Sequence, residues 1–250
     1  MWNWIKTRWT SQQGEETAVQ HGHISQRRPE LRAFVREQER QELFDGLWNK
    51  LRENRLDSVV SAASQLLDST TPQEALEAHK IMGQVSINRH RYQEAVTHFR
   101  YVVSLQPSAD SWFNLATAAV LAGELELGEE AFEQALEISV EQGNSAYPSV
   151  PFMRLYFCCA LIEQNAIESA FHQVNILRSN YEKVRNTDQI FLQQRGLPSL
   201  QHTMKVAENL FKRARNHFDY ETWLAEFSGQ LDPAGQQLLE HMRVTLRSGV

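Results

Sequence analysis

The chain has 250 residues, enough for one large domain or two small ones, and its apolar content of 42% can fill a sizeable core. Its 11 glycines, seven prolines and charged fraction of 22% exclude a collagen-like or disordered chain. A net charge of −6 argues against a general nucleic-acid binder, since such proteins are more often basic, and no nucleic-acid partner is expected.

Cysteine usage and the amino terminus predict a cytoplasmic protein. The two cysteines, Cys158 and Cys159, are adjacent and cannot form a disulfide framework. The first nine residues carry charges among their apolar side chains and lack the features of a signal peptide. No window holds the roughly 18 uncharged apolar residues that a membrane-spanning helix needs, so we expect no integral membrane segment.

Charge is distributed unevenly along the chain. Residues 108–150 contain eight acidic residues and no lysine or arginine, whereas residues 178–217 contain eight basic residues and three acidic ones. The expected explanation is two solvated helix faces. The alternative is attraction between the two regions, either within the chain or between copies of it.

The first predicted elements follow an amino-terminal arm. Residues 1–28 show no sustained hydrophobic period and are expected to be loosely ordered. From residue 29 onward nearly the whole chain has helical periodicity. Apolar side chains spaced by three and four predict a long helix over about residues 29–55 and a shorter one over about residues 56–69.

A capping box predicts the start of a third helix. In the sequence 71–74, the Thr71 hydroxyl can accept from the Glu74 amide while the Glu74 carboxylate reaches back, and Pro72 needs no donor. Further helix breaks recur near residues 88–91, 106–108, 123, 143–151, 165, 196–198, 217–219 and 229–233. Since alternating β-branched runs do not occur, the predicted fold class is all-α.

Two stretches of the chain, residues 76–107 and the stretch that starts at residue 110, align with a constant offset of 33 residues. The matched pairs are Gly83 and Ala116, Ala95 and Gly128, and Phe99 and Phe132. Small residues let the two helices of one unit cross closely, and large residues fill the space between successive units. The offset therefore predicts a repeated helical hairpin.

This pattern resembles the tetratricopeptide repeat, a helix-turn-helix unit of about 34 residues that stacks into a solenoid. The resemblance is closest over residues 76–139 and looser over 43–177, with a third copy that places Ile167 at the turn and Ala170 at the crossing. It implies tetratricopeptide-like repeats over residues 29–185, after the flexible arm. Residues 186–250 are predicted to be capping helices that cover the last apolar face.

Catalytic and metal-binding signatures are missing from the sequence. No phosphate-binding loop, dinucleotide fingerprint, nucleophile elbow or zinc motif occurs, so we predict no enzyme activity, catalytic residue, metal or cofactor. His21 and His23 make at most two metal ligands on the arm. Cys158 and His172 could form a thiolate–imidazole pair, although a small residue at a helix crossing explains Cys158 better. A thiol- or metal-dependent enzyme is the weaker alternative.

In tetratricopeptide proteins the first helix of each repeat lines a concave groove that holds an extended peptide. At the positions of the family's carboxylate clamp, Lys80 and Asn114 keep the usual residue types and Gln84 replaces asparagine. Phe152 and Tyr156 replace two basic residues. Without those two cations the groove cannot neutralise a cluster of terminal carboxylates, so binding of chaperone tails is not expected.

These positions offer apolar and aromatic surface instead, which predicts a peptide or helix with large apolar anchors as the ligand. The predicted peptide-binding residues are Lys80, Gln84, Phe113, Asn114, Thr117, Phe152, Tyr156 and Cys159. The alternative is that the carboxy-terminal helices or the arm fill the groove.

The sequence therefore predicts a protein–protein interaction scaffold, an adaptor or chaperone-like binder, with a protein or peptide partner. The alternative from another class is a structural subunit that forms a homo-oligomer through its acidic centre and basic carboxy-terminal region. On the arm, Trp2, Ile5 and Trp9 share a helical face close to Lys6 and Arg8. This composition suits a hydrophobic groove on a protein or, as a weaker alternative, peripheral contact with a membrane.

Overall fold

The computed structural model describes residues 27–143, 148–214 and 217–248. These residues form twelve α-helices, a short 3-10 helix and no strand, which confirms the predicted all-α class. The predictions for the arm, including those for Trp2, Ile5, Trp9, His21 and His23, lie outside the described residues. Two compact units divide the chain, residues 1–105 and 106–250. The boundaries predicted after residues 28 and 185 separate the arm, the repeats and the capping helices, and they stay predictions.

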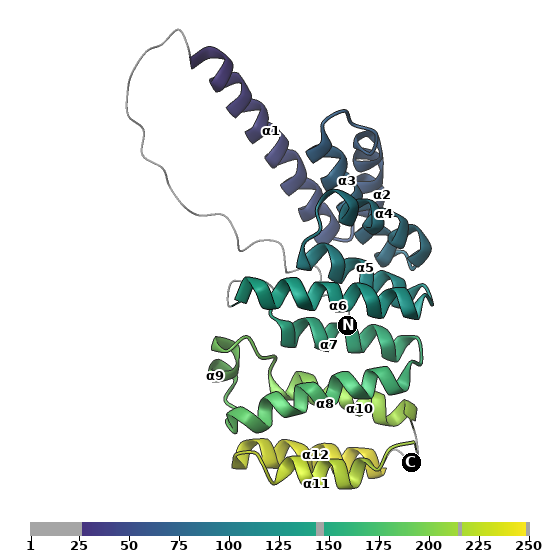
Figure 1. The fold of residues 1–250 in the computed structure, drawn as a ribbon, viewed down its shortest axis with the longest axis vertical. Coiled ribbons are helices and arrows are strands. Elements are labelled where there is room, and N and C mark those ends of the chain that lie inside the picture. Colours follow the sequence, from purple (N-terminus) through teal and green to yellow (C-terminus); the bar gives the residue numbers. More distant parts are fainter. Residues whose placement is uncertain (1–26, 144–147, 215–216, 249–250) are drawn as a thin grey trace. The chain divides into compact units, whose positions relative to one another are not determined.

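In its described part the first unit consists of two helical hairpins. The helices are α1 (Arg27–Arg52), α2 (Leu56–Ala63), continued by the 3-10 helix η2 (Ser64–Leu66), α3 (Pro72–Asn88) and α4 (Tyr92–Leu105) (Figure 1). Helix α3 packs on α4 and also on both helices of the first hairpin. Each helix thereby buries an apolar face that it could not bury alone.

Among the side chains of α1 that the structure describes, residues 34–52, those that contribute to the core of this unit lie in the carboxy-terminal half of the helix. Phe34 in the other half is 59% exposed, whereas Leu47 is 1% exposed. The core residues that pack together are Phe44, Leu47, Trp48 and Leu51 of α1, Val59 and Ala63 of α2, and Ile81 and Val85 of α3.

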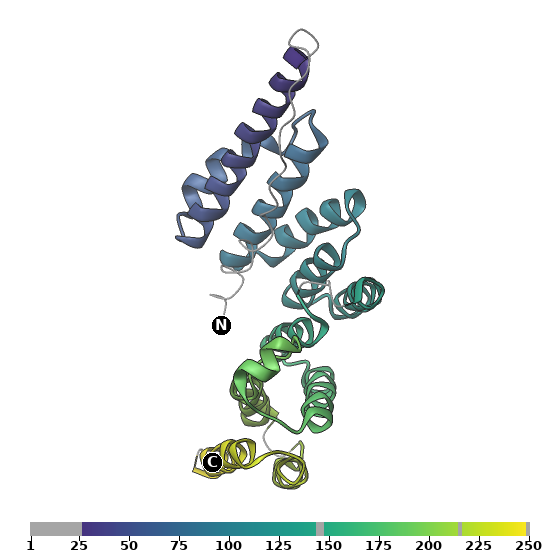
Figure 2. The same cartoon turned by 90° about the vertical axis from the view of Figure 1, so that its left-hand side faces the viewer.

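The second unit contains two more hairpins and four further helices. These are α5 (Ala109–Leu121), α6 (Leu125–Gln142), α7 (Val150–Glu163), α8 (Ile167–Val184), α9 (Gln189–Gln194), α10 (Leu200–Ala214), α11 (Tyr220–Ser228) and α12 (Pro233–Ser248). In Figure 2 several helices of this unit, among them α6 (teal) and α8 (green), are seen nearly end-on. Helix α7 packs between α5 and α10, and these three form what we call the inner layer.

The same turn joins the two helices of all four hairpins. In each turn three successive amides bond to carbonyls four, three and five residues earlier, as in Arg89–Val85, His90–Ile87 and Arg91–Ser86. The middle residue of each turn is left-handed, namely Asn54, His90, Gly123 and Asn165 with φ of 60°, 57°, 84° and 59°. The second and third turns lie 33 residues apart, which matches the offset in the sequence.

Small residues lie where the helices of a hairpin cross, as the sequence predicts. Ala95 and Ala116 are both 0% exposed. A Cβ atom on Gly83 of α3 would come within 2.6 Å of the Phe99 ring on α4. A Cβ on Gly128 of α6 would overlap a methyl group of Val120 on α5 and approach the carbonyl of Ala116 to 3.1 Å. Larger side chains at these glycines would force the helices apart.

Two local predictions need correction. Helix α3 begins at Pro72 as predicted, but the side chain of Thr71 makes no capping hydrogen bond. The Glu74 carboxylate instead accepts a hydrogen bond of 2.5 Å from the Ser69 hydroxyl, so the capping box does not form. In addition, residues 189–194 form the short helix α9, which the sequence did not predict because six residues are too few to show a helical period.

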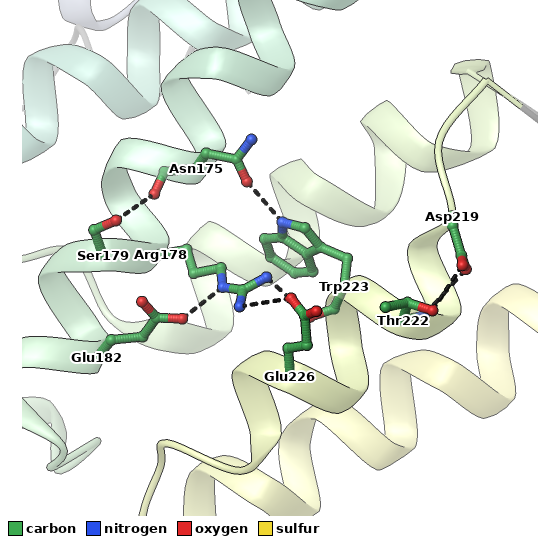
Figure 3. A network of polar contacts seen from close by, with 8 residues as sticks. All are labelled: Asn175, Arg178, Ser179, Glu182, Asp219, Thr222, Trp223 and Glu226. Atoms are coloured by element: carbon green, nitrogen blue, oxygen red, sulfur yellow. Dashed lines mark hydrogen bonds and ion pairs between the residues drawn. The ribbon is translucent and has the colours of Figure 1, made fainter.

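Polar contacts fasten α11 to α8 at the carboxy-terminal end of the second unit (Figure 3). The indole Nε1 of Trp223 donates to the side-chain oxygen of Asn175 over 2.7 Å. Arg178 donates to Glu182 (2.6 Å), to the carbonyl of Trp223 (3.2 Å) and to Glu226 (3.3 Å). These bonds satisfy polar groups that burial would otherwise leave unpaired, which stabilises the docking of α11.

Candidate partner-binding face

The eight residues predicted to line the groove are divided between the two units. Lys80 and Gln84 lie on α3, Phe113, Asn114 and Thr117 on α5, and Phe152, Tyr156 and Cys159 on α7. The structure therefore brings together six of the eight within the inner layer of the second unit. The two residues on α3 belong to the first unit.

The two residues on α3 make hydrogen bonds within their own helix. The ammonium group of Lys80 lies 2.7 Å from the Glu77 carboxylate, and only 13% of the lysine side chain is exposed. The side-chain amide of Gln84 donates to Asn88 over 3.4 Å. Because Glu77 neutralises Lys80, this lysine offers less positive charge to a ligand carboxylate than its residue type suggests.

Two of the three residues on α5 are buried. Phe113 is 4% exposed, and its ring centroid lies 6.2 Å from that of Phe132 on α6. Thr117 is 9% exposed and donates its hydroxyl to the Phe113 carbonyl over 3.0 Å. The expectation that these two side chains offer open apolar surface is thus wrong. Asn114, one turn before the buried Ala118, is partly exposed, and its amide donates to the Asp110 carboxylate over 3.3 Å.

Three partly exposed rings form a row on α7 and α10, which we call the aromatic ridge: Phe152, Tyr156 and His202. Phe152 and Tyr156 share a face of α7 because they are four residues apart. Their rings are nearly parallel at 20°, with centroids 6.3 Å apart. The His202 ring lies edge-on to Tyr156 at 6.0 Å. The ridge therefore combines flat apolar faces with one polar ring.

His202 is the member of the ridge that the sequence did not predict. Helix α10 runs alongside α7, as shown by the hydrogen bond of 2.7 Å from Arg213 to the carbonyl of Ile162. Burial, and then the positive charge of Lys205, lower the pKa of His202 below its usual value. The ring is consequently neutral at pH 7 and can both donate and accept a hydrogen bond.

The chain matches no protein-family model, no curated protein and no solved structure.

The two cysteines are buried on α7. Cys158 is 0% exposed, and its thiol donates to the Ala170 carbonyl over 3.5 Å at the crossing of α7 and α8. Burial raises the pKa of Cys158 well above its usual value. Burial and the nearby Glu163 raise the pKa of Cys159 to about 12. Both thiols are protonated at neutral pH, whereas a nucleophilic cysteine needs the thiolate. His172, on α8, is exposed.

No group of three or more His, Cys, Asp or Glu side chains arranged to hold a metal ion occurs in residues 27–143, 148–214 and 217–248. Across the same residues, no helix combines the length and the apolar composition needed to cross a bilayer.

Proposed function

We propose that this protein is a tetratricopeptide-like scaffold without enzyme activity, located in the cytoplasm, which binds a peptide or helix of a partner protein along the inner layer. The observation that carries the proposal is the aromatic ridge. It consists of two rings on α7, the first helix of its hairpin and thus the position that the resemblance assigns to the ligand, and of one ring on α10, which packs on α7.

The chemistry of the ridge favours a ligand with large apolar anchors. Aromatic side chains provide contact area while losing few rotatable bonds on binding, and Tyr is enriched at the energetic centres of interfaces. Asn114 on the adjacent α5 supplies an amide that can bond to the backbone of a bound peptide. Because Phe113 and Thr117 are buried, they pack beneath the exposed surface of α5 and are not expected to contact the ligand.

Peptides selected from a random library for binding to the full chain provide a direct test. Replacing Phe152 and Tyr156 with alanine should weaken their binding at least about tenfold, which corresponds to about 1.4 kcal/mol. Phe34→Ala is the matched control, because Phe34 is an exposed ring on α1 of the other unit. Fluorescence anisotropy measures the affinities, and circular dichroism checks the helical content. The proposal is contradicted if Phe34→Ala weakens binding as much as the replacement of Phe152 and Tyr156 does, or if no peptide binds the chain.

A structural subunit is the second candidate function. Helix α6 favours it, since it carries six glutamates and no basic residue. An exposed acidic helix of this kind can pair with basic regions of other copies.

A further inference from the structure

Two histidines face each other across the hairpin of α3 and α4. Nδ1 of His79 on α3 lies 3.0 Å from Nδ1 of His98 on α4, and both side chains are partly exposed. The Tyr101 ring stacks on His79 with centroids 3.9 Å apart and the planes at 22°. The two nitrogens are hydrogen-bonded to each other, and the stack limits the rotation of the His79 ring and keeps its Nδ1 close to that of His98.

We propose that His79 and His98 together bind a divalent transition-metal ion, of the Cu²⁺ or Ni²⁺ class, through their two Nδ1 atoms. Two bonds of about 2.0–2.1 Å at a right angle separate the ligand nitrogens by about 2.9 Å, whereas a tetrahedral angle separates them by about 3.4 Å. The observed separation of 3.0 Å is close to the first value. It matches neighbouring positions in the tetragonal geometry that Cu²⁺ and Ni²⁺ prefer.

The electrostatic surroundings also suit a cation. Burial lowers the pKa of His79, opposed by the negative charge of Asp68. Burial and the neighbouring His79 lower the pKa of His98, opposed by Glu94. Imidazole binds metal through an unprotonated nitrogen, so binding should weaken as the pH falls. Asp68 and Glu94 thus place negative charge near the two rings, and water would complete the coordination of a bound ion.

Metal binding would tie α3 to α4. Because the two histidines converge only in the folded hairpin, the ion binds the folded chain more tightly than the unfolded chain and raises its stability. This inference concerns the first unit alone and is independent of peptide binding at the ridge.

The test uses the full chain with His21→Asn and His23→Asn, so that the arm contributes no competing histidine pair. Titration calorimetry with Ni²⁺ at about pH 7.5, above the usual His pKa, should show one ion per chain. His79→Gln and His98→Gln, added singly, should each weaken binding about tenfold or more, as expected when a ligand group is lost. His241→Gln on the exposed face of α12 is the matched control and should leave the affinity unchanged.

A second measurement does not depend on these variants. Electron paramagnetic resonance of the chain with His21→Asn and His23→Asn, loaded with Cu²⁺, should show hyperfine structure from two nitrogens. Absence of Ni²⁺ binding, unchanged affinity in both histidine variants, or a Cu²⁺ spectrum from a single nitrogen would each overturn the proposal and leave the two rings as a simple hydrogen-bonded pair.

Discussion

At the scale of single residues, the close crossing of the two helices in a hairpin depends on glycine, which has no side chain to hold them apart. Gly128→Ala places a methyl group against Val120 and close to the backbone of α5, and neither can move without separating the two helices. We expect this change to lower the free energy of unfolding by about 1–3 kcal/mol, the usual cost of overpacking a core. Chemical denaturation monitored by circular dichroism measures the loss.

Gly46 on α1 provides the matched control, because a Cβ atom there has no neighbour within 4 Å. Alanine is intrinsically the better helix former, so Gly46→Ala should leave stability unchanged or raise it by up to about 1 kcal/mol. Similar losses for the two changes would show that helix propensity, and not close crossing of helices, explains Gly128.

A second residue-scale prediction concerns pH and His202. Since burial and Lys205 lower its pKa in the folded chain, the unfolded chain binds more protons as the pH falls below about 6.5. The contribution of this residue to stability is therefore complete above the unfolded pKa and is lost as the pH falls towards the folded pKa. The melting temperature of the unaltered chain should drop more between about pH 7.5 and about pH 5.5 than that of His202→Gln.

The comparison uses the size of each drop and not the absolute melting temperature, because the change also removes a ring contact with Tyr156. The other histidines are common to both chains, so their titration cancels in the difference. Equal drops would mean that the surroundings of His202 favour its charged and neutral forms equally.

At the scale of elements, the sequence predicts helices and turns well where a local signal exists. The breaks expected near residues 88–91, 123 and 165 coincide with left-handed turns at His90, Gly123 and Asn165. Glycine and asparagine tolerate this conformation, and the sequence around His90 is polar enough to interrupt the apolar period. The capping box predicted at Thr71 was wrong because its local signal is overruled by a neighbour. Ser69, which lies outside the motif, donates its hydroxyl to the Glu74 carboxylate.

The candidate binding face was harder to predict from sequence. Spacing alone places Phe152 and Tyr156 on one side of α7. Helix α5, however, is buried along almost its whole surface, with ten buried residues, so no polar stripe in its sequence marks the open side. His202 and Tyr156 are 46 positions apart in the sequence, and only tertiary packing determines the contact between their rings.

At the scale of the whole molecule, the question is whether the acidic and basic regions assemble copies of the chain. Several basic groups of the second unit already have partners. Arg178 is paired with Glu182 and Glu226, and Lys212 with Glu208. The basic charge left to attract the acidic α6 of another copy is correspondingly smaller.

We therefore expect the mass of the particle to be independent of ionic strength. Sedimentation velocity at about 50 mM and about 500 mM salt should give the same mass, because only contacts between exposed charges weaken strongly over this range. Glu130→Lys combined with Glu133→Lys reverses charge on the exposed side of α6 and should also leave the mass unchanged. A larger particle at low salt that dissociates both at high salt and in the variant would instead support the structural subunit, because assembly by charge requires both responses.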